Sequence, residues 1–524
     1  MTRIRSQALV GGSLFIVGSL LAWQVGKKIV ANDMRSVIYA AMGFAACVVA
    51  VVILRNWRTG FYFFLFWLMF EDLFRKYMGN GLALFFGKDL LLTLTYLSFY
   101  VSLRKRRENI LRPPFLFFLS LFFWLGVLQM FNQNSPSIWY GLLGIKIYFF
   151  YVPLIFVGYA LIRDDESLRK FLVMNAVLAV AIAAVGILQG ILGNSFLNPS
   201  NLASDLQLLG DLQKTNLSGV SFNLPDSVFV SSGRFASYLA LAFIVAMGAA
   251  GYLLLYTKRS RKLMFFAIGI LGVATLMSGS RGTFVSLILT AGLLSAGFLW
   301  GAPWRWKQGY RMLKAVRRSA LVAAAGLIII FALFPKQAGS RLEFYSETLL
   351  PNGGNYELGN RTWDYPVDNF LAVFSKPNWM VGNGIGTSAL GTQYVAKLTG
   401  EPPPNLGVEE GYGTMIIEMG VLAPILWILW TAALVYYSWK VVRGLRETRF
   451  FPIGLAIVWY AVLLLFIWTY GSLSGYENYI CNAYLWLLVG ILFRLPSLAR
   501  AGAAPVIASP VISPVIQTRP GYQF

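Results

Sequence analysis

Four isolated cations, in or beside long apolar segments, are the residues of this sequence that most clearly could do chemistry. Lys88 lies in "FFGKDLLLTL", Lys146 in "GLLGIKIYFFYVPL", Arg234 in "SSGRFASYLALAF" and Arg281 in "LMSGSRGTFVSL". A charge within a membrane-spanning segment is costly, so by default it faces a polar cavity and marks a functional site. Because no matching run of acids accompanies these cations, the pattern predicts a pocket for an anion. Arginine suits a phosphate or pyrophosphate, since its planar fork donates two parallel hydrogen bonds.

Local explanations stay open for these cations. Lys88 could simply pair with its neighbour Asp89, Lys146 could extend to the membrane interface, and Arg281 could be an interfacial anchor. The nearby charged segment "FEDLFRKY" (residues 70–77) ends an apolar segment on the same side. We interpret its charges as a solvated helix end.

The chain contains no histidine. This excludes Ser-His-Asp and Cys-His nucleophile systems, histidine-ligated zinc and histidine proton relays, so acid-base chemistry must use Asp, Glu, Lys, Arg or Tyr. Cys47 and Cys481 lie in or at the edge of apolar segments, where a cysteine behaves as a small hydrophobe, and no disulfide framework is expected. Asp364 and Asp368 lie one helical turn apart, and we interpret them as a solvated face. We predict no metal and no cofactor.

The elements that must position these residues are membrane helices. The sequence is 57% hydrophobic and only 13% charged, whereas a soluble domain has about 25% charged residues. Apolar segments recur at the length of roughly 20 residues that crosses a bilayer. They predict an all-α integral membrane protein with about 14 transmembrane helices, near residues 8–25, 37–54, 59–70, 82–103, 113–130, 139–160, 171–192, 235–256, 263–278, 283–300, 319–334, 413–438, 452–470 and 479–494.

The basic residues set the predicted topology. Lys and Arg number 44 against 22 Asp and Glu, and most lie in short loops such as 104–112, 258–262, 305–318 and 440–449. Such loops are cytoplasmic by the positive-inside rule, which places both termini in the cytoplasm and gives no reason to expect nucleic-acid binding.

One membrane domain is therefore predicted over residues 1–495. Its external loops are 193–233 and 335–412, and the second, between spans 11 and 12, is large enough to be partly helical. The proline-rich segment 496–524 is predicted to be a disordered cytoplasmic tail.

Three segments carry a family pattern through their order and spacing. They are "SGRFASYLA" (232–240), "LMSGSRGTFVSL" (276–287) and the loop "NRTWDYPVDNFLAVFSKPNWMVGNGIGTSALG" (360–391) followed by "VEEGYGTMIIEMGVL" (408–422). The chain resembles the bacterial O-antigen polymerase and O-antigen ligase superfamily, polytopic membrane glycosyltransferases that act on polyprenyl-pyrophosphate-linked glycans.

In that family the loop reads as an Arg, an amphipathic helix, a Pro, a Gly-x-Gly-x-Gly-like turn, and a His-Asn-x-Tyr segment ending in Glu-x-Gly. The matching residues here are Arg361, Pro377, Gly382, Gly384, Gly386, Tyr412, Glu418 and Gly420. The chain departs from the family where Glu409 stands at the His position and Glu410 at the Asn position. The glycine run could cradle phosphate, but outside a strand-helix unit that signal is weak, and a flexible turn is the simpler interpretation.

The resemblance implies that a growing glycan leaves undecaprenyl pyrophosphate and joins a sugar hydroxyl of a second lipid-linked repeat unit. Arg234 and Arg281 would bind the pyrophosphate in one outer-face cavity, with Arg281 also catalytic, and Arg361, Lys146, Lys88 and Tyr412 would complete the substrate site. Glu409 or Glu410 would serve as base, although both could instead cap the segment leading into span 12.

The implied setting is the bacterial inner membrane, with the active site facing the periplasm. The implied partners are the lipid-linked donor and acceptor glycans, membrane lipids, a flippase and a chain-length regulator. Loss of the family's His argues for a polymerase-type enzyme over an O-antigen ligase, and a protein glycosyltransferase stays open.

A transporter of a small anion is the alternative from another class. It would also show many spans and intramembrane charges, but it should hold these charges near the midplane, on broken helices within internal repeats. Here the charges cluster toward the outer face.

Overall fold

The computed structural model describes residues 47–503, apart from 80, 107–110, 194, 200–212, 216–220, 258, 304–305, 336–338, 340–342, 347–358 and 405. The first predicted span and the tail beyond Ala503 lie outside these residues. Eight of the described helices are long and apolar enough to cross a membrane. The larger number of about 14 spans stays a prediction.

Helices coincide with every predicted span from residue 59 onward, because each apolar segment satisfies its own backbone hydrogen bonds by coiling. The first five are α3 (Trp57–Met78), α4 (Leu82–Arg106), α5 (Leu116–Gln129), α6 (Ile138–Phe149) and α7 (Leu154–Leu161). The middle set is α8 (Asp165–Leu192), α10 (Ser232–Tyr256), α11 (Arg261–Met277), α12 (Arg281–Gly301) and α13 (Trp306–Leu333). The last set is α19 (Leu422–Gly444), α20 (Phe451–Val462), α21 (Thr469–Gly471), α22 (Ser474–Glu477) and α23 (Tyr479–Ala503).

Short elements fill the described parts of the two predicted external loops. Strands β1 (Gln213–Thr215) and β2 (Ser221–Asn223) form an antiparallel pair in which Lys214 faces Phe222. The second loop contains the π-helix η1 (Asn360–Asp364), α16 (Tyr365–Ala372), the 3-10 turn η2 (Val373–Ser375), α17 (Thr392–Thr399) and α18 (Gly411–Met419). The described part of this loop is therefore largely helical.

Three predicted boundaries are wrong. The span predicted at 319–334 begins earlier, because α13 starts at Trp306 and includes most of the predicted loop 305–318. The span placed at 413–438 is two helices, because Gly420 adopts a φ of +79° and separates α18 from α19. The last helix continues past the predicted boundary at residue 495, through Pro496 to Ala503. A proline lacks the N–H for one helical hydrogen bond and its ring crowds the carbonyl four residues earlier, but it need not end a helix that neighbours hold in place.

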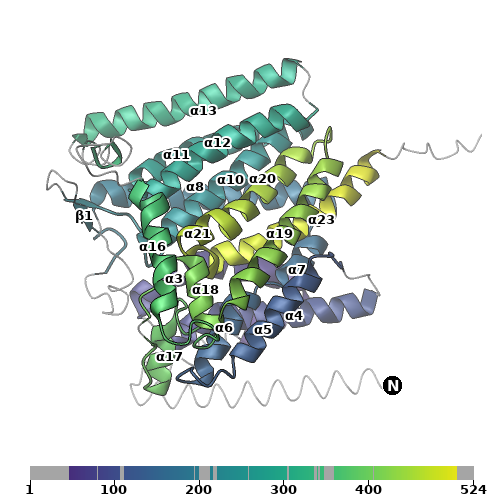
Figure 1. The fold of residues 1–524 in the computed structure, drawn as a ribbon. Coiled ribbons are helices and arrows are strands. Elements are labelled where there is room, and N and C mark those ends of the chain that lie inside the picture. The colour runs from purple at the N-terminus through teal and green to yellow at the C-terminus, as the bar shows by residue number, and fades with distance from the viewer. Residues whose placement is uncertain are drawn as a thin grey trace, which may run out of the picture.

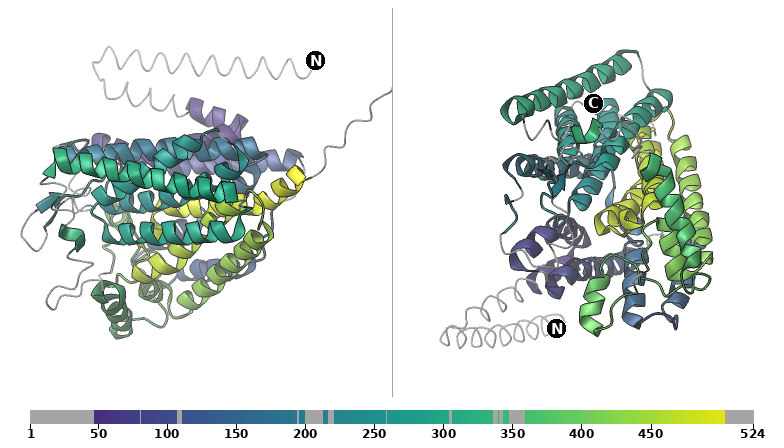
Figure 2. Two further views of the ribbon diagram at one scale, coloured as in Figure 1. Left: turned by 90° about the horizontal axis from the view of Figure 1, so that it is seen from above. Right: turned by 60° about the vertical axis from the view of Figure 1, so that its left-hand side comes forward.

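The last helices of the chain lie between the two earlier groups. Figure 1 shows α19 to α23 in yellow-green between α4 to α7 and the layer of α8 to α12, with α13 along the outer edge. The right-hand view of Figure 2 shows the same order from another side. A close approach lies between α7 and α23, where Cβ atoms built on Gly158 and Gly490 would lie 2.2 and 2.1 Å from carbonyl oxygens of the opposite helix. Small residues thus let the two backbones meet, as is usual for membrane helices.

The helix ends fall into two sets at opposite ends of the bundle. Near one end, Arg449 pairs with Asp165 and its guanidinium lies 4.9 Å from the ring centre of Tyr256. At the other end, the first turn of α10 pairs with the end of α3 through Arg234. Because α10 has 25 residues, these ends lie about 37 Å apart. Arg449, which belongs to the predicted cytoplasmic segment 440–449, thus lies far from the first turn of α10.

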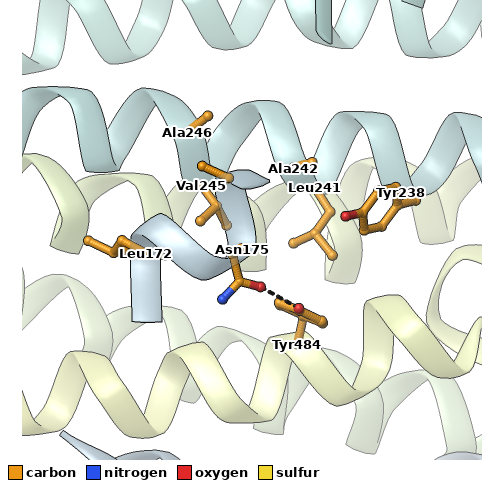
Figure 3. A pocket seen from close by; sticks show the side chains of 9 residues that line it. Leu172, Asn175, Tyr238, Leu241, Ala242, Val245, Ala246 and Tyr484 are labelled. Carbon is orange, nitrogen blue, oxygen red and sulfur yellow. Dashed lines mark hydrogen bonds between the residues drawn. The ribbon is translucent and has the colours of Figure 1, made fainter. Parts of the chain in front are cut away.

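A small internal cavity lies between α8, α10 and α23 (Figure 3). The Tyr484 hydroxyl donates to Asn175 Oδ1 at 2.5 Å across it. Its volume is about 20 Å³, enough for one water. Its wall is otherwise mostly apolar, so it fits a packing feature and not a substrate site.

Candidate functional site

The end of α3 is a buried ionic centre. Glu71, Asp72 and Arg75 are each 0% exposed, so their interpretation as a solvated helix end is wrong. Arg75 Nη1 donates to Asp72 Oδ1 at 2.8 Å, and Lys76 Nζ lies 2.9 Å from Asp226 Oδ2. Charges buried in this way must be paired, because transfer of a lone ion out of water is prohibitively costly.

Each of three predicted cations meets an acid from another part of the chain. Lys88 Nζ lies 2.9 Å from Glu71 Oε1, and Lys146 Nζ lies 2.6 Å from Asp89 Oδ2. The suggestion that Lys88 pairs with Asp89 is therefore wrong, because Asp89 forms an ion pair with Lys146 instead.

Arg234 also has an acidic partner, which corrects the premise that these cations lack matching acids. Its Nη1 lies 2.8 Å from Asp72 Oδ2 and 3.0 Å from Asp72 Oδ1. The acid comes from α3, which is remote in sequence, so spacing along the chain could not indicate it.

Asp72 is shared by two arginines, Arg75 and Arg234. Glu71, Asp89 and Asp226 each pair with one lysine among the described residues. An anion bound beside Arg234 would be attracted to its guanidinium, because unlike charges attract strongly where water is excluded.

A cavity of about 280 Å³ brings three of the predicted site residues together. Lys88, Lys146 and Arg234 line it, together with Glu477 and the segment Ser388 to Tyr394. We call it the charged cavity. Its volume is close to the lower limit of small-molecule pockets, about 300 Å³, so it has room for the reacting groups of a substrate but not for a whole glycan.

Three buried polar atoms on the wall of this cavity have no hydrogen-bond partner among the described residues. They are the hydroxyls of Tyr151 and Tyr479 and Oε1 of Glu477. Tyr151 and Tyr479 are 3% and 7% exposed. Buried polar groups are normally hydrogen-bonded, so these atoms suit a polar ligand within the cavity.

Arg234 also keeps donors. Its described hydrogen bonds to Asp72 both use Nη1, and its guanidinium carbon lies 4.9 Å from the ring centre of Tyr479. Within the described part of the chain, no hydrogen bond uses Nε or Nη2 of this arginine. These donors have the planar arrangement that recognises phosphate oxygens.

The glycine run forms a buried, anchored turn, in contrast to the predicted flexible turn. Gly382, Gly384 and Gly386 have φ angles of +92°, +100° and +84°, which an L-residue with a side chain rarely adopts. The backbone N–H groups of Asn383 and Gly384 donate to carbonyl oxygens of α18 at 2.8 and 2.9 Å. Since those N–H groups are used within the protein, they are not donors for a phosphate.

Two glutamates connect this turn to the helices. Glu418 is 0% exposed, and its carboxylate accepts from the Ser388 N–H and from the Tyr148 hydroxyl, both at 2.9 Å. Glu477 Oε2 accepts from the Leu390 N–H at 3.0 Å. Hydrogen bonds to Glu418 and Glu477 therefore hold the segment from Ser388 to Leu390 in place in the cavity wall.

The two glutamates at the family's His and Asn positions are used elsewhere. Glu410 is buried and caps α18, since its two oxygens accept from the N–H groups of Tyr412 and Gly413 at 2.9 and 2.5 Å. Glu409 is exposed and accepts from the Tyr365 hydroxyl at 2.6 Å. Neither is among the described residues that line the charged cavity. Glu410 therefore makes the contacts expected of a residue that caps the segment leading into span 12, which was the alternative to a role as base.

We expect Glu410 to make stability fall as the pH rises. Burial raises the pKa of Glu410 from 4.5 to about 7, although two N–H groups oppose this. Between these values the folded protein holds a proton that the unfolded chain releases, so stability is lost from pH 4.5 to 7. Relative to wild type, Glu410→Gln should gain on the order of 3 kcal/mol in unfolding free energy between pH 5 and pH 8. Unfolding titrations with SDS in mixed micelles measure this, and parallel curves for the two proteins would contradict the raised pKa.

The remaining predicted residues lie apart from the cavity or outside the described part of the chain. Arg281 begins α12, and its guanidinium carbon lies 3.7 Å from the ring centre of Phe344. It is not among the described residues that line the cavity with Arg234. Tyr412 is half-buried in the first turn of α18. Arg361 belongs to η1, and its side chain lies outside the described part.

Sequence reasoning missed Glu477 and treated Asp72 only as context. A usable signal existed for Glu477, which stands two residues before the last apolar segment in "SGYENYICN". An acid in so short a connection between two spans deserves the same scrutiny as an isolated cation. No comparable signal exists for the pairing of Asp72 with Arg234.

Comparison with known proteins yields no relative from which a role could be transferred. No family model, no curated protein and no solved structure matches the chain. The function is therefore inferred from the site itself and from the sequence pattern.

Proposed function

We propose that this protein is a membrane glycosyltransferase that polymerises oligosaccharide repeat units carried on a polyprenyl pyrophosphate. The observation that carries the proposal is the charged cavity, where Lys88, Lys146 and Arg234 meet around about 280 Å³. Support from the sequence comes from the ordered motifs shared with the O-antigen polymerase and ligase superfamily.

The leaving group explains why such a cavity is useful. When a glycan departs from its lipid, negative charge develops on the pyrophosphate, and fixed cations in a water-poor site stabilise that charge. The three cations on the cavity wall, and the donors of Arg234 that no described residue uses, suit this task. Tyr151 and Tyr479 would orient sugar or phosphate oxygens through their hydroxyls.

The proposed setting is a bacterial inner membrane with about 14 spans and both termini in the cytoplasm. The charged cavity would then open toward the periplasm, since it lies at the end of the bundle remote from the basic loops. The loops 193–233 and 335–412 would lie on that same side. A flippase would deliver the lipid-linked units, and a chain-length regulator would set the product size.

An assay with defined substrates tests this function. Purified protein in lipid nanodiscs is mixed with polyprenyl-pyrophosphate-linked repeat units, and the products are separated on a gel. We expect a ladder of lipid-linked glycans that differ by one repeat unit and grow with time. Transfer of a single glycan to a lipid or protein acceptor, without a ladder, would instead favour a ligase or protein glycosyltransferase. Uptake of a labelled anion by proteoliposomes without glycan transfer would overturn the proposal in favour of a transporter.

A further inference from the structure

Glu477 is the only carboxylate among the described residues that line the charged cavity. It ends α22, lines the cavity and accepts one hydrogen bond, from the Leu390 N–H to Oε2 at 3.0 Å. Its second oxygen, Oε1, is buried and has no hydrogen-bond partner among the described residues. No described cation forms an ion pair with it. This carboxylate therefore has an oxygen available to accept a proton.

The other acids near the cavity already have partners. Glu71, Asp72 and Asp89 each form an ion pair with a lysine or arginine within 3 Å. Both oxygens of Glu418 accept hydrogen bonds from Ser388 and Tyr148. Those four carboxylates maintain the structure of the site.

The surroundings of Glu477 also adjust its basicity. Burial, together with the nearby carboxylate of Glu418, raises the pKa of Glu477 to about 8. A general base is most effective when its pKa lies near the working pH. The other titratable or charged groups around the cavity are Lys88, Lys146, Tyr151, Arg234, Tyr394 and Tyr479.

We infer that Glu477 is the general base of this site and accepts the proton of the attacking sugar hydroxyl. The inference depends on the proposed glycosyltransferase function. As the hydroxyl oxygen bonds to the anomeric carbon of the donor glycan, its proton passes to Glu477 Oε1. The bond from that carbon to the pyrophosphate oxygen breaks, and its electron pair leaves with the pyrophosphate beside Arg234. Glu477 then releases the proton to water.

Replacing Glu477 by glutamine removes the basicity of the side chain and nearly keeps its shape. Glu477→Gln keeps an oxygen that can accept from the Leu390 N–H, so the cavity wall should stay in place. We expect the initial polymerisation rate to fall by about 10² to 10⁴, the usual contribution of a general base, while binding of a labelled lipid-linked donor stays unchanged. Glu401→Gln is the matched control, because Glu401 is exposed and lies outside the described cavity lining. It should polymerise at the wild-type rate.

The dependence of the polymerisation rate on pH distinguishes a base from a residue with a purely structural role. Replacing a structural residue would not change the shape of this dependence. The wild-type rate should rise about tenfold per pH unit below the pKa of the base and level off above it. The residual rate of Glu477→Gln should lack this rise, and Glu477→Asp should retain it with a displaced midpoint.

The possible outcomes distinguish failure of the general-base role from failure of the proposed glycosyltransferase function. If Glu477→Gln polymerises normally while wild type forms a ladder, Glu477 is not the base and the glycosyltransferase function stands. If the variant loses donor binding as well as rate, its role is structural and the inference fails. If wild type forms no glycan product at all, the proposed function itself fails.

Discussion

Arg234→Gln is expected to reduce polymer formation by about 10² to 10³ and to destabilise the protein. The change removes the charge that we assign to the departing pyrophosphate, and loss of one such stabilising donor typically has this effect on rate. It also leaves Asp72, which is 0% exposed, with only one of its two arginines. Because Arg75 still pairs with Asp72, we expect the loss to stay below the roughly 3 to 5 kcal/mol that an uncompensated buried charge costs. Ladder assays and SDS titrations measure the two effects separately.

A second variant at the same position distinguishes chemistry from folding. Arg234→Lys keeps a positive charge that can pair with Asp72, but it lacks the planar fork that binds two phosphate oxygens at once. We expect this variant to recover most of the lost stability while polymer formation stays reduced. If Arg234→Lys polymerises at the wild-type rate, the fork of Arg234 does not hold the pyrophosphate, and the pyrophosphate assignment is wrong.

Gly386→Ala should have the second large effect, a loss of about 2 to 5 kcal/mol in stability together with loss of activity. Part of the cost is conformational, because the φ of Gly386 is +84° and a Cβ atom in this region costs about 1 to 2 kcal/mol. The rest is steric. The Cβ would lie 2.3 Å from the carbonyl oxygen of Tyr140 and 2.6 Å from the backbone nitrogen of Gly144, and overpacking costs a further 1 to 3 kcal/mol. Moving α6 away from the turn would displace Lys146 from the cavity wall.

Gly400→Ala is the control for this prediction. Gly400 has a φ of +76°, but a Cβ atom at this position would meet nothing within 4 Å. It therefore reports the conformational cost alone, about 1 to 2 kcal/mol, with activity retained. Unfolding titrations of both variants in the same micelles make the comparison. Equal losses would mean that the contact between the glycine turn and α6 yields easily and does not hold the cavity wall.

Much of the helical architecture followed from the sequence by itself. An apolar segment must form a helix in a bilayer because every backbone polar group has to be satisfied within the segment. That requirement is local, and so the segments predicted near 235–256 and 283–300 agree with α10 and α12 to within a few residues. The convergence of Lys88, Lys146 and Arg234 on one cavity could also be anticipated, because a cation inside a span has to find a polar environment.

Where sequence reasoning was wrong, the reason was a contact between residues that are distant along the chain. Spacing reveals neighbours such as Lys88 and Asp89, but the actual partners are Glu71 for Lys88 and Asp72 for Arg234. Helix packing decided those pairs, and packing depends on surfaces that come together only when the bundle forms. The same packing buried the end of α3, which its charged sequence had suggested was solvated.

The tertiary structure alone selected the carboxylate that lines the cavity. Glu409 and Glu410 match a family motif by position, yet Glu410 caps a helix and Glu409 bonds to Tyr365 at the surface. Glu477 matches no motif but lies on the cavity wall with an unpartnered oxygen among the described residues. The sequence by itself determined which segments become helices and which cations need a polar site, because those requirements act within one segment. Which acid meets which cation, and which carboxylate stays available, was decided only by the folded bundle, because those properties depend on burial and distance between separate helices.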